Sequence, residues 1–339
     1  MRYVIIGAGA VGATIGGRLF AAGHEAVLVA RGAHYEALRE GGLRLTTPDF
    51  AATLPVPAAD GPGAVALRPD DVLVLAVKTQ DSVAALDAWA ACPVEGGGTA
   101  ASRLPVLCAQ NGVENERLAL RRFRTVYGVC VWLPATFLEP GVVVASAGPL
   151  TGMLHVGRFP APPPGTSDPL AVRIAADLEG AGFGVPLPPD VMPWKYAKLL
   201  GNLGNALQAI CGVSDDPVAR DLLGRAREEG ARALDAAGIA YVDTAEQQRV
   251  RGDLVTVREI DGVRRQGGSS WQSLARGTGS IEADHLNGEV VLLGRAHGVR
   301  TPVNEVLQRV AGDFARERRR PGELTSGQLM ELVGRLPGA

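Results

Sequence analysis

Residues 3–12 read Tyr3-Val-Ile-Ile-Gly7-Ala-Gly9-Ala-Val-Gly12, a short apolar run that ends on a Gly-x-Gly-x-x-Gly motif. Small and apolar residues continue towards Gly23, so the motif is predicted to join a strand to a helix. In such a turn the first glycine permits a tight bend, the second admits a pyrophosphate, and the third lets helix and strand pack closely. The helix N-terminus adds free N–H donors. The context favours a dinucleotide-binding turn over a plain Gly-rich turn, with the predicted residues Gly7, Ala8, Gly9, Ala10, Val11 and Gly12.

Short apolar runs alternate with helical patterns through the first half of the chain. The runs at 25–30, 72–77, 104–109 and 125–133 read as strands, and the run at 72–77 is apolar throughout, as in parallel strands buried on both faces. Beyond the Pro-rich segment 186–193, strand signals almost vanish and helical periodicity extends to about residue 333. We therefore expect an α/β protein. An N-terminal Rossmann-type parallel sheet covers residues 1–188, and an all-helical C-terminal domain covers residues 189–339.

Composition limits the class of partner. The chain has 339 residues and a formal net charge of −2, so no basic field favours nucleic acid or an acidic membrane. The four cysteines lie far apart without metal-ligand spacing, which predicts reduced thiols and no metal site. The N-terminus lacks a signal-peptide pattern, and prolines and glycines break the longest uncharged stretch. A soluble, cytoplasmic protein with a small-molecule partner is expected, and a homodimer is left open.

The predicted strand at 25–30 is followed by Arg31, where NAD-binding sites usually carry Asp or Glu for the ribose 2′-hydroxyl. A guanidinium offers paired donors that suit a 2′-phosphate, and neither neighbour in sequence is acidic. Arg31 therefore favours NADPH or NADP as the dinucleotide. A surface arginine without a phosphate role is the alternative.

Two more polar residues directly follow predicted strands. Lys78 comes after the strand at 72–77, and Asn111 comes after the strand at 104–109. The carboxyl ends of parallel strands meet at one edge of a sheet, where ligands of such folds bind. We expect both residues to contact cofactor or substrate there, although an Asn-Gly pair such as Asn111-Gly112 is also an ordinary turn former.

A polar stripe runs along the first helix predicted after the Pro-rich segment. Its members are spaced 3, 4 and 3 residues apart on an otherwise apolar helix: Lys195, Lys198, Asn202 and Asn205. Buried polar groups need partners, so the stripe either faces a polar ligand in a cleft between the domains, or joins an internal hydrogen-bond network, or faces solvent. A second polar set places Glu282, His285 and Glu289 on one helical face, and Ser270 lies near the start of the preceding helix.

Taken together in this order, these motifs make the chain resemble the ketopantoate reductase (2-dehydropantoate 2-reductase) family over nearly its full length. The resemblance rests on residues 7–12, Arg31, Val77-Lys78, Gln110-Asn111-Gly112, Lys198-Leu-Leu-Gly-Asn202, Ser270, residues 282–288 and Arg295-Ala-His-Gly298. The resemblance implies NADPH-dependent reduction of a 2-oxo acid to a 2-hydroxy acid. It also implies that the substrate is 2-dehydropantoate, which would be reduced to pantoate in pantothenate biosynthesis.

The resemblance also implies roles for single residues. It implies that Lys198 is the proton donor and that Glu282 holds both this lysine and the cofactor. Lys195, on the same predicted stripe, is the alternative proton donor. The substrate contacts are Asn111, Asn202 and Ser270, joined by Asn205. The cofactor contacts are residues 7–12, Arg31, Lys78, Asn111 and Glu282, with Ala135 near the nicotinamide.

This sequence departs from the family pattern at one position of interest. Many members carry a second asparagine four residues after the first, where this chain has Ala206, and Asn205 stands one position earlier. Two alternatives stay open: the same reaction on a different branched 2-oxo acid, and a non-catalytic NADP(H)-binding sensor.

Overall fold

Strand β1 (Arg2–Ile6) shows why the first part of the chain forms a sheet covered on both faces. Tyr3 and Ile5 pack into one buried apolar cluster, and Val4 and Ile6 pack into another. Successive side chains of a strand point to opposite faces, so an unbroken apolar run fits only a strand with a core on each side. Strand β6 (Asp71–Leu75) repeats the pattern and pairs with β1 in parallel register.

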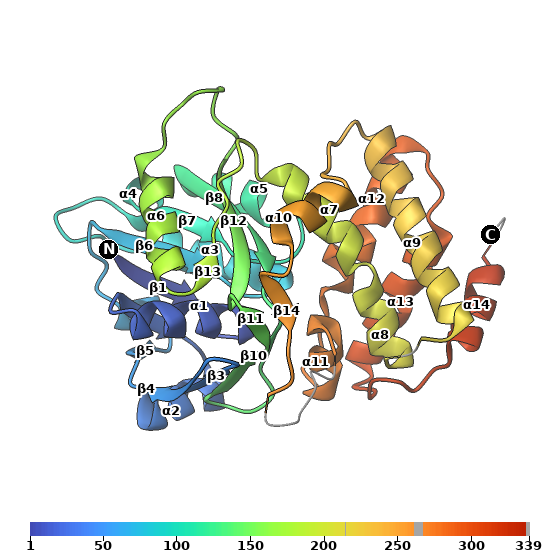
Figure 1. Ribbon diagram of the computed structural model, residues 1–339, viewed down its shortest axis with the longest axis horizontal. Helices are drawn as coiled ribbons and strands as arrows, with labels where there is room; N and C mark the ends of the chain where they lie inside the picture. The colour runs from blue at the N-terminus through green and yellow to red at the C-terminus, as the bar shows by residue number, and fades with distance from the viewer. Residues whose placement is uncertain (214, 261–266, 337–339) are drawn as a thin grey trace. The chain divides into compact units, whose positions relative to one another are not determined.

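The computed structural model describes residues 1–213, 215–260 and 267–336. Contacts divide the chain into two compact units (Figure 1). The first unit is Met1–Lys195 with Thr244–Arg265, and the second is Tyr196–Asp243 with Gln266–Ala339. The domain boundary expected at residue 189 stays a prediction.

The main sheet of the first unit has eight strands among the described residues. In spatial order they are β13 (Phe183–Gly184), β12 (Gly152–Phe159), β8 (Thr125–Trp132), β7 (Pro105–Cys108), β6, β1, β2 (Glu25–Val29) and β5 (Ala58–Ala59). From β5 to β8 the pairs are parallel and follow the 3-2-1-4-5-6 order of dinucleotide-binding sheets. The expected α/β class and Rossmann-type sheet are confirmed, while β12 adds an antiparallel strand beside β8.

Smaller sheets and helices complete the first unit. One small sheet contains β4 (Phe50–Leu54), β3 (Leu43–Thr47), β10 (Val142–Ala145) and β9 (Ala135–Thr136), and another pairs β11 (Ala147–Pro149) with β14 (Val255–Val257). The helices of this unit are α1 (Ala10–Ala21), α2 (Gly32–Gly41), α3 (Ser82–Ala90), α4 (Ala100–Arg103), α5 (Asn115–Leu120), α6 (Pro169–Gly180) and α10 (Thr244–Arg251), with short 3-10 turns η1 (Pro62–Ala64) and η2 (Thr79–Asp81). Strand β14 interrupts a region that the sequence predicts as helical, because its backbone pairs with β11.

The described elements of the second unit are all helical, as predicted. Helix α7 (Met192–Asn202) leads into it, followed by α8 (Gly204–Cys211), α9 (Pro217–Ala236), α11 (Ser269–Ala275), η3 (Glu282–His285), α12 (Asn287–His297), α13 (Pro302–Arg316) and α14 (Ser326–Gly334). Helix α13 begins with Thr301 as N-cap and Pro302 in its first turn, where the fixed φ of proline suits a helix start. Helices α9, α12 and α13 pack on one another around a shared apolar core (Figure 1).

Two other expectations can be compared with the structure. All four cysteines are free thiols. Across the described residues, no helix combines the length and the apolar character needed to cross a membrane.

Candidate functional site

The Gly-rich turn after β1 has the geometry that a dinucleotide requires. Gly7 has a φ of +100°, and a Cβ there would lie 2.6 Å from the Val77 amide nitrogen. A Cβ on Gly12 would lie 2.2 Å from the Gly7 carbonyl oxygen. A Cβ on Gly9, in contrast, would have no atom within 4 Å. Two glycines are therefore needed for packing, and the middle one faces open space at the N-terminus of α1, where an anion is stabilised.

The ends of three neighbouring strands meet this turn. The amides of Gly7 and Ala8 donate to the Val29 carbonyl at 3.1 and 2.9 Å, which places the turn beside the end of β2. Arg31 follows two residues later, at the N-cap of α2, with an exposed side chain. At the end of β6, the amide of Ala76 donates to the Ile6 carbonyl at 2.8 Å.

The end of β7 continues the same edge. Thr79, next to Lys78, donates its hydroxyl to the Asn111 carbonyl at 3.2 Å, and the side chain of Asn115 donates to the same oxygen at 3.2 Å. Arg31, Lys78 and Asn111 are thus gathered with the turn at the carboxyl edge of the sheet, where the strand order reverses between β1 and β6. These residues and this cradle fit a bound dinucleotide.

His34 is a contact of the Gly-rich turn that the sequence did not reveal. The amide of Gly141 donates to its Nδ1 at 3.0 Å, so this nitrogen is an acceptor and the proton of the neutral ring lies on Nε2. That Nε2–H donates to the Ala8 carbonyl at 2.6 Å. The ring also packs on Phe137, with 4.4 Å between centroids. His34 therefore ties the second residue of the motif to α2 and to the segment before β10.

His34→Asn should weaken NADPH binding. Asparagine can still accept from the Gly141 amide but cannot reach the Ala8 carbonyl, and one lost hydrogen bond of about 1 kcal/mol corresponds to about a fivefold higher Kd. A fluorescence titration with NADPH measures this. His34→Gln, which keeps a donor near the Nε2 position, is the matched control and should bind nearly as wild type. Equal Kd values for all three proteins would show that the contact does not matter.

Ala135 lies on the small sheet and not on the main one. It is 4% exposed, pairs with Ala145 of β10, and belongs to the same apolar cluster as Ala8. Its strand β9 contacts α1. Its expected role near the nicotinamide stays a prediction.

Lys195 forms a buried ion pair within the first unit. Its Nζ lies 2.5 Å from Oε1 of Glu116 and donates to the Gln110 carbonyl at 3.2 Å. Lys195 is 3% exposed and Glu116 is fully buried. Burial raises the pKa of the Glu116 carboxyl, and the charge of Lys195 opposes that rise. Lys195 therefore has a structural role in this ion pair, unlike the role in ligand binding that was expected for the polar stripe.

The remaining members of the stripe lie on two helices, because α7 ends at Asn202 and α8 begins after Leu203. The prediction of one continuous helix is wrong at this point. Lys198 is half-buried on α7, and Asn202, the last residue of that helix, is 6% exposed.

Asn205 is the second residue of α8 and faces the start of α11. Its Oδ1 lies 3.1 Å from the position of a Cβ on Gly268, and the Gly268 amide donates to Oε1 of Gln208 at 2.7 Å. Ser270, two residues after Gly268, is 2% exposed. Its hydroxyl has no hydrogen-bond partner in the part of the chain that the structure describes. Ala206 is 1% exposed in the apolar core. Asn205 and Gln208 therefore face the start of α11, while position 206 faces the core.

The segment that follows Ile281 is not one helix. Glu282 and His285 lie in η3, and the backbone breaks at Leu286 before α12, so the prediction that Glu282, His285 and Glu289 share one helical face is wrong. Glu282 is 5% exposed. The side chain of Asn287 donates to the Leu203 carbonyl at 3.1 Å. This bond holds the segment against the junction of α7 and α8, next to Asn202.

Comparison with known proteins assigns the family. Residues 3–161 match the family model described as ketopantoate reductase PanE/ApbA, and residues 190–314 match its C-terminal model. The chain belongs to the ketopantoate reductase family.

Relatives in distant organisms agree with this assignment. The protein named 2-dehydropantoate 2-reductase in Mesorhizobium japonicum is 30% identical over 94% of this chain and 99% of its own length. The protein of that name in Archaeoglobus fulgidus is 27% identical over 90% of this chain and 95% of its own. The chain is therefore an oxidoreductase of the 2-dehydropantoate 2-reductase type, acting on a CH–OH group, and the family implies a nicotinamide cofactor.

Solved structures share the fold. A PanE/ApbA family ketopantoate reductase from Ralstonia eutropha JMP134 has a TM-score of 0.76 and 30% identity, with 94% of this chain and 99% of that chain covered. D-mandelate dehydrogenase, solved with NADH and anilino(oxo)acetate, also has a TM-score of 0.76, with coverage of 94% and 99%. Its identity is 20%, so this second likeness concerns the fold alone.

Proposed function

We propose that this enzyme reduces 2-dehydropantoate to pantoate with NADPH, as a step of pantothenate biosynthesis. The observation that carries the proposal is the turn at residues 7–12, where packing requires Gly7 and Gly12 while Gly9 opens to free space. The names of the relatives in Mesorhizobium japonicum and Archaeoglobus fulgidus support the substrate. The proposal places the enzyme in the cytoplasm, with the oxo acid as its partner.

The first unit holds the cofactor in this proposal. The amides at the start of α1 and residues 7–12 bind its pyrophosphate, and Arg31 binds the 2′-phosphate. Lys78 and Asn111 bind it at the ends of β6 and β7, Ala135 adjoins the nicotinamide, and Glu282 contacts the cofactor from the helical unit. When bound, the nicotinamide supplies the hydride.

Lys198 supplies the proton. Hydride addition to the 2-oxo carbon leaves negative charge on the carbonyl oxygen, and a positioned ammonium both stabilises that charge and protonates the oxygen. Glu282 keeps the ammonium in place. Lys195 is unsuited to this role because Glu116 and the Gln110 carbonyl already occupy its ammonium.

Amide and hydroxyl groups hold the oxo acid. Asn111, Asn202, Asn205 and Ser270 present donors of the kind that bind a carboxylate and a hydroxyl. The Ser270 hydroxyl supports this role, because a buried hydroxyl without a partner is costly unless a ligand completes its hydrogen bonds.

A substrate screen tests the proposed function. Purified enzyme is mixed with NADPH and a panel of 2-oxo acids, and the loss of NADPH absorbance is followed. We expect the highest kcat/KM with 2-dehydropantoate. NADPH binding without oxidation by any oxo acid would contradict the proposal and favour a non-catalytic NADP(H) sensor.

One observation favours a second substrate candidate. Position 206, where the family pattern implies an asparagine, holds a core-facing alanine, and Asn205 lies beside the start of α11. The side-chain amide proposed to contact the substrate therefore comes from position 205 instead of position 206. This difference supports the same reaction on another branched 2-oxo acid. A higher kcat/KM for such an acid than for 2-dehydropantoate in the screen would identify it.

A further inference from the structure

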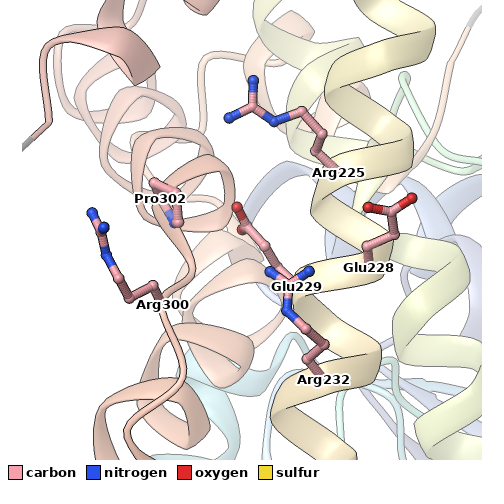
Figure 2. A pocket seen from close by; sticks show the side chains of 6 residues that line it. All are labelled: Arg225, Glu228, Glu229, Arg232, Arg300 and Pro302. Atoms are coloured by element: carbon pink, nitrogen blue, oxygen red, sulfur yellow. The ribbon is translucent and has the colours of Figure 1, made fainter. Parts of the chain in front are cut away.

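The helical unit contains a charged cavity that none of the proposed site residues lines. Its volume is about 200 Å³, and its lining is Arg225, Glu228, Glu229, Arg232, Arg300 and Pro302. Figure 2 shows the first four residues on α9, with Arg300 and Pro302 across from them. Arg300 lies just before α13, and Pro302 is the first residue of that helix. A water molecule occupies about 30 Å³ in the liquid, so the cavity has room for a polyatomic ion.

The charge of Glu229 is already used inside the protein. Its Oε1 accepts from the Val303 amide at 3.0 Å, and its Oε2 accepts from the amide and the side chain of Asn304 at 3.0 and 2.8 Å. The carboxylate is 3% exposed and caps the positive N-terminus of α13. Helix α13 and the donors of Val303 and Asn304 therefore stabilise the Glu229 carboxylate. Glu228 also lines the cavity, so three arginines face two carboxylates there and leave one net positive charge.

Two of these arginines form no close ion pair within the described part of the chain, although the charge of Arg232 acts on the Glu229 carboxylate. Among the described residues, no acidic side chain lies within ion-pair distance of Arg225 or Arg232. The Arg225 guanidinium donates to Sδ of Met330 at 3.4 Å, which is a weak acceptor. Seven residues separate the two, so they lie two turns apart on one face of α9. In Figure 2 the Arg225 side chain extends from α9 towards the segment that carries Arg300 and Pro302.

We propose that this cavity binds a small anion with at least two negative charges, such as a diphosphate or a polycarboxylate. Guanidinium groups match the oxygen pairs of phosphates and carboxylates, and charge-assisted hydrogen bonds are the strong ones. An anion with two charged groups can bind Arg225 and Arg232 together and place its remaining oxygens near Arg300. The inference concerns a second site and does not depend on the reductase reaction.

Calorimetric titration of the full-length protein with pyrophosphate, at constant ionic strength, tests the proposal. The Gly-rich turn is itself a pyrophosphate-type site, so the titration is made with and without saturating NADPH. We expect one site per chain that NADPH does not block, with a Kd on the order of 1 mM or lower. Citrate, titrated in the same way, shows whether polycarboxylates share the site.

Substitutions in α9 locate the binding. R225Q/R232Q should weaken the NADPH-insensitive binding by about tenfold or more, because two of the three guanidinium groups that line the cavity are lost. R227Q, an exposed arginine of the same helix that does not line the cavity, is the matched control and should leave the Kd unchanged. The thermal unfolding midpoint of each variant reports that it is folded, and the single variants R225Q and R232Q replace the double one if it unfolds.

Two results would overturn the proposal. One is the absence of NADPH-insensitive binding by both pyrophosphate and citrate. The other is a Kd for R225Q/R232Q equal to that of wild type. If NADPH itself fails to bind, the proposed function is in error. The pyrophosphate Kd values of R225Q/R232Q and wild type still test the anion site, so the two proposals fail separately.

Discussion

Lys198→Ala should reduce kcat with the true oxo acid by about 10²–10⁴-fold, the usual contribution of a general acid. The ammonium acts on the oxygen that gains charge during hydride transfer, and alanine can neither stabilise that charge nor supply a proton. NADPH binding should change little, because the cofactor's phosphates are assigned to the first unit. Steady-state kinetics and an NADPH titration measure the two quantities. A kcat within about threefold of wild type would contradict the assignment, since so small a loss lies well below the contribution of a general acid.

Lys195→Met is the contrasting variant. It leaves the buried Glu116 carboxylate without its ion-pair partner, and such a loss costs about 3–5 kcal/mol of stability. We expect a lower thermal unfolding midpoint, with the effect on turnover much smaller than that of Lys198→Ala in protein that is folded. If the folded Lys195→Met enzyme were inactive and Lys198→Ala were active, the two lysines would have to exchange roles.

Arg31→Asp should reverse the cofactor preference. The change removes charge-assisted hydrogen bonds to a 2′-phosphate, which contribute about 1.5–3 kcal/mol, and NADPH should therefore bind about 10–100-fold more weakly. NADH lacks that phosphate, and a carboxylate can accept from its ribose 2′-hydroxyl, so its affinity should be kept or improved. Fluorescence titrations with both dinucleotides measure the difference.

Arg39→Asp is the control for charge alone. Arg39 is exposed on the same helix, pairs with Glu40, and lies eight residues from Arg31. The substitution Arg39→Asp should leave the ratio of the Kd values for NADPH and NADH unchanged. An equal loss of NADPH and NADH affinity in Arg31→Asp would remove the 2′-phosphate role.

The sheet and its Gly-rich turn could be predicted because the signals are local. The apolar run before Gly7 needs a core on both faces, and the spacing of Gly7, Gly9 and Gly12 specifies a turn with close backbone approaches. Parallel strands then place Lys78 and Asn111 at the same edge, since carboxyl ends meet there. The functions of these two residues stay predictions.

The features that the sequence did not reveal depend on distant contacts or on breaks in the backbone. Lys195 pairs with Glu116, 79 residues away, and the tie between His34 and Gly141 spans 107 residues. Helical periodicity passes through Leu203 and Leu286 without a stop signal, yet α7 ends before the first and α12 begins after the second. Tertiary packing decides such breaks, and side-chain spacing alone does not report it.

A crystal structure of the enzyme with NADP and its hydroxy acid product measures the central claim most directly. The quantity is the distance from Nζ of Lys198 to the oxygen of the 2-hydroxyl group. We predict a hydrogen bond of about 2.6–3.2 Å, the reach of a general acid. A different proton donor at that distance, with Lys198 beyond hydrogen-bond reach of the product, would contradict the account.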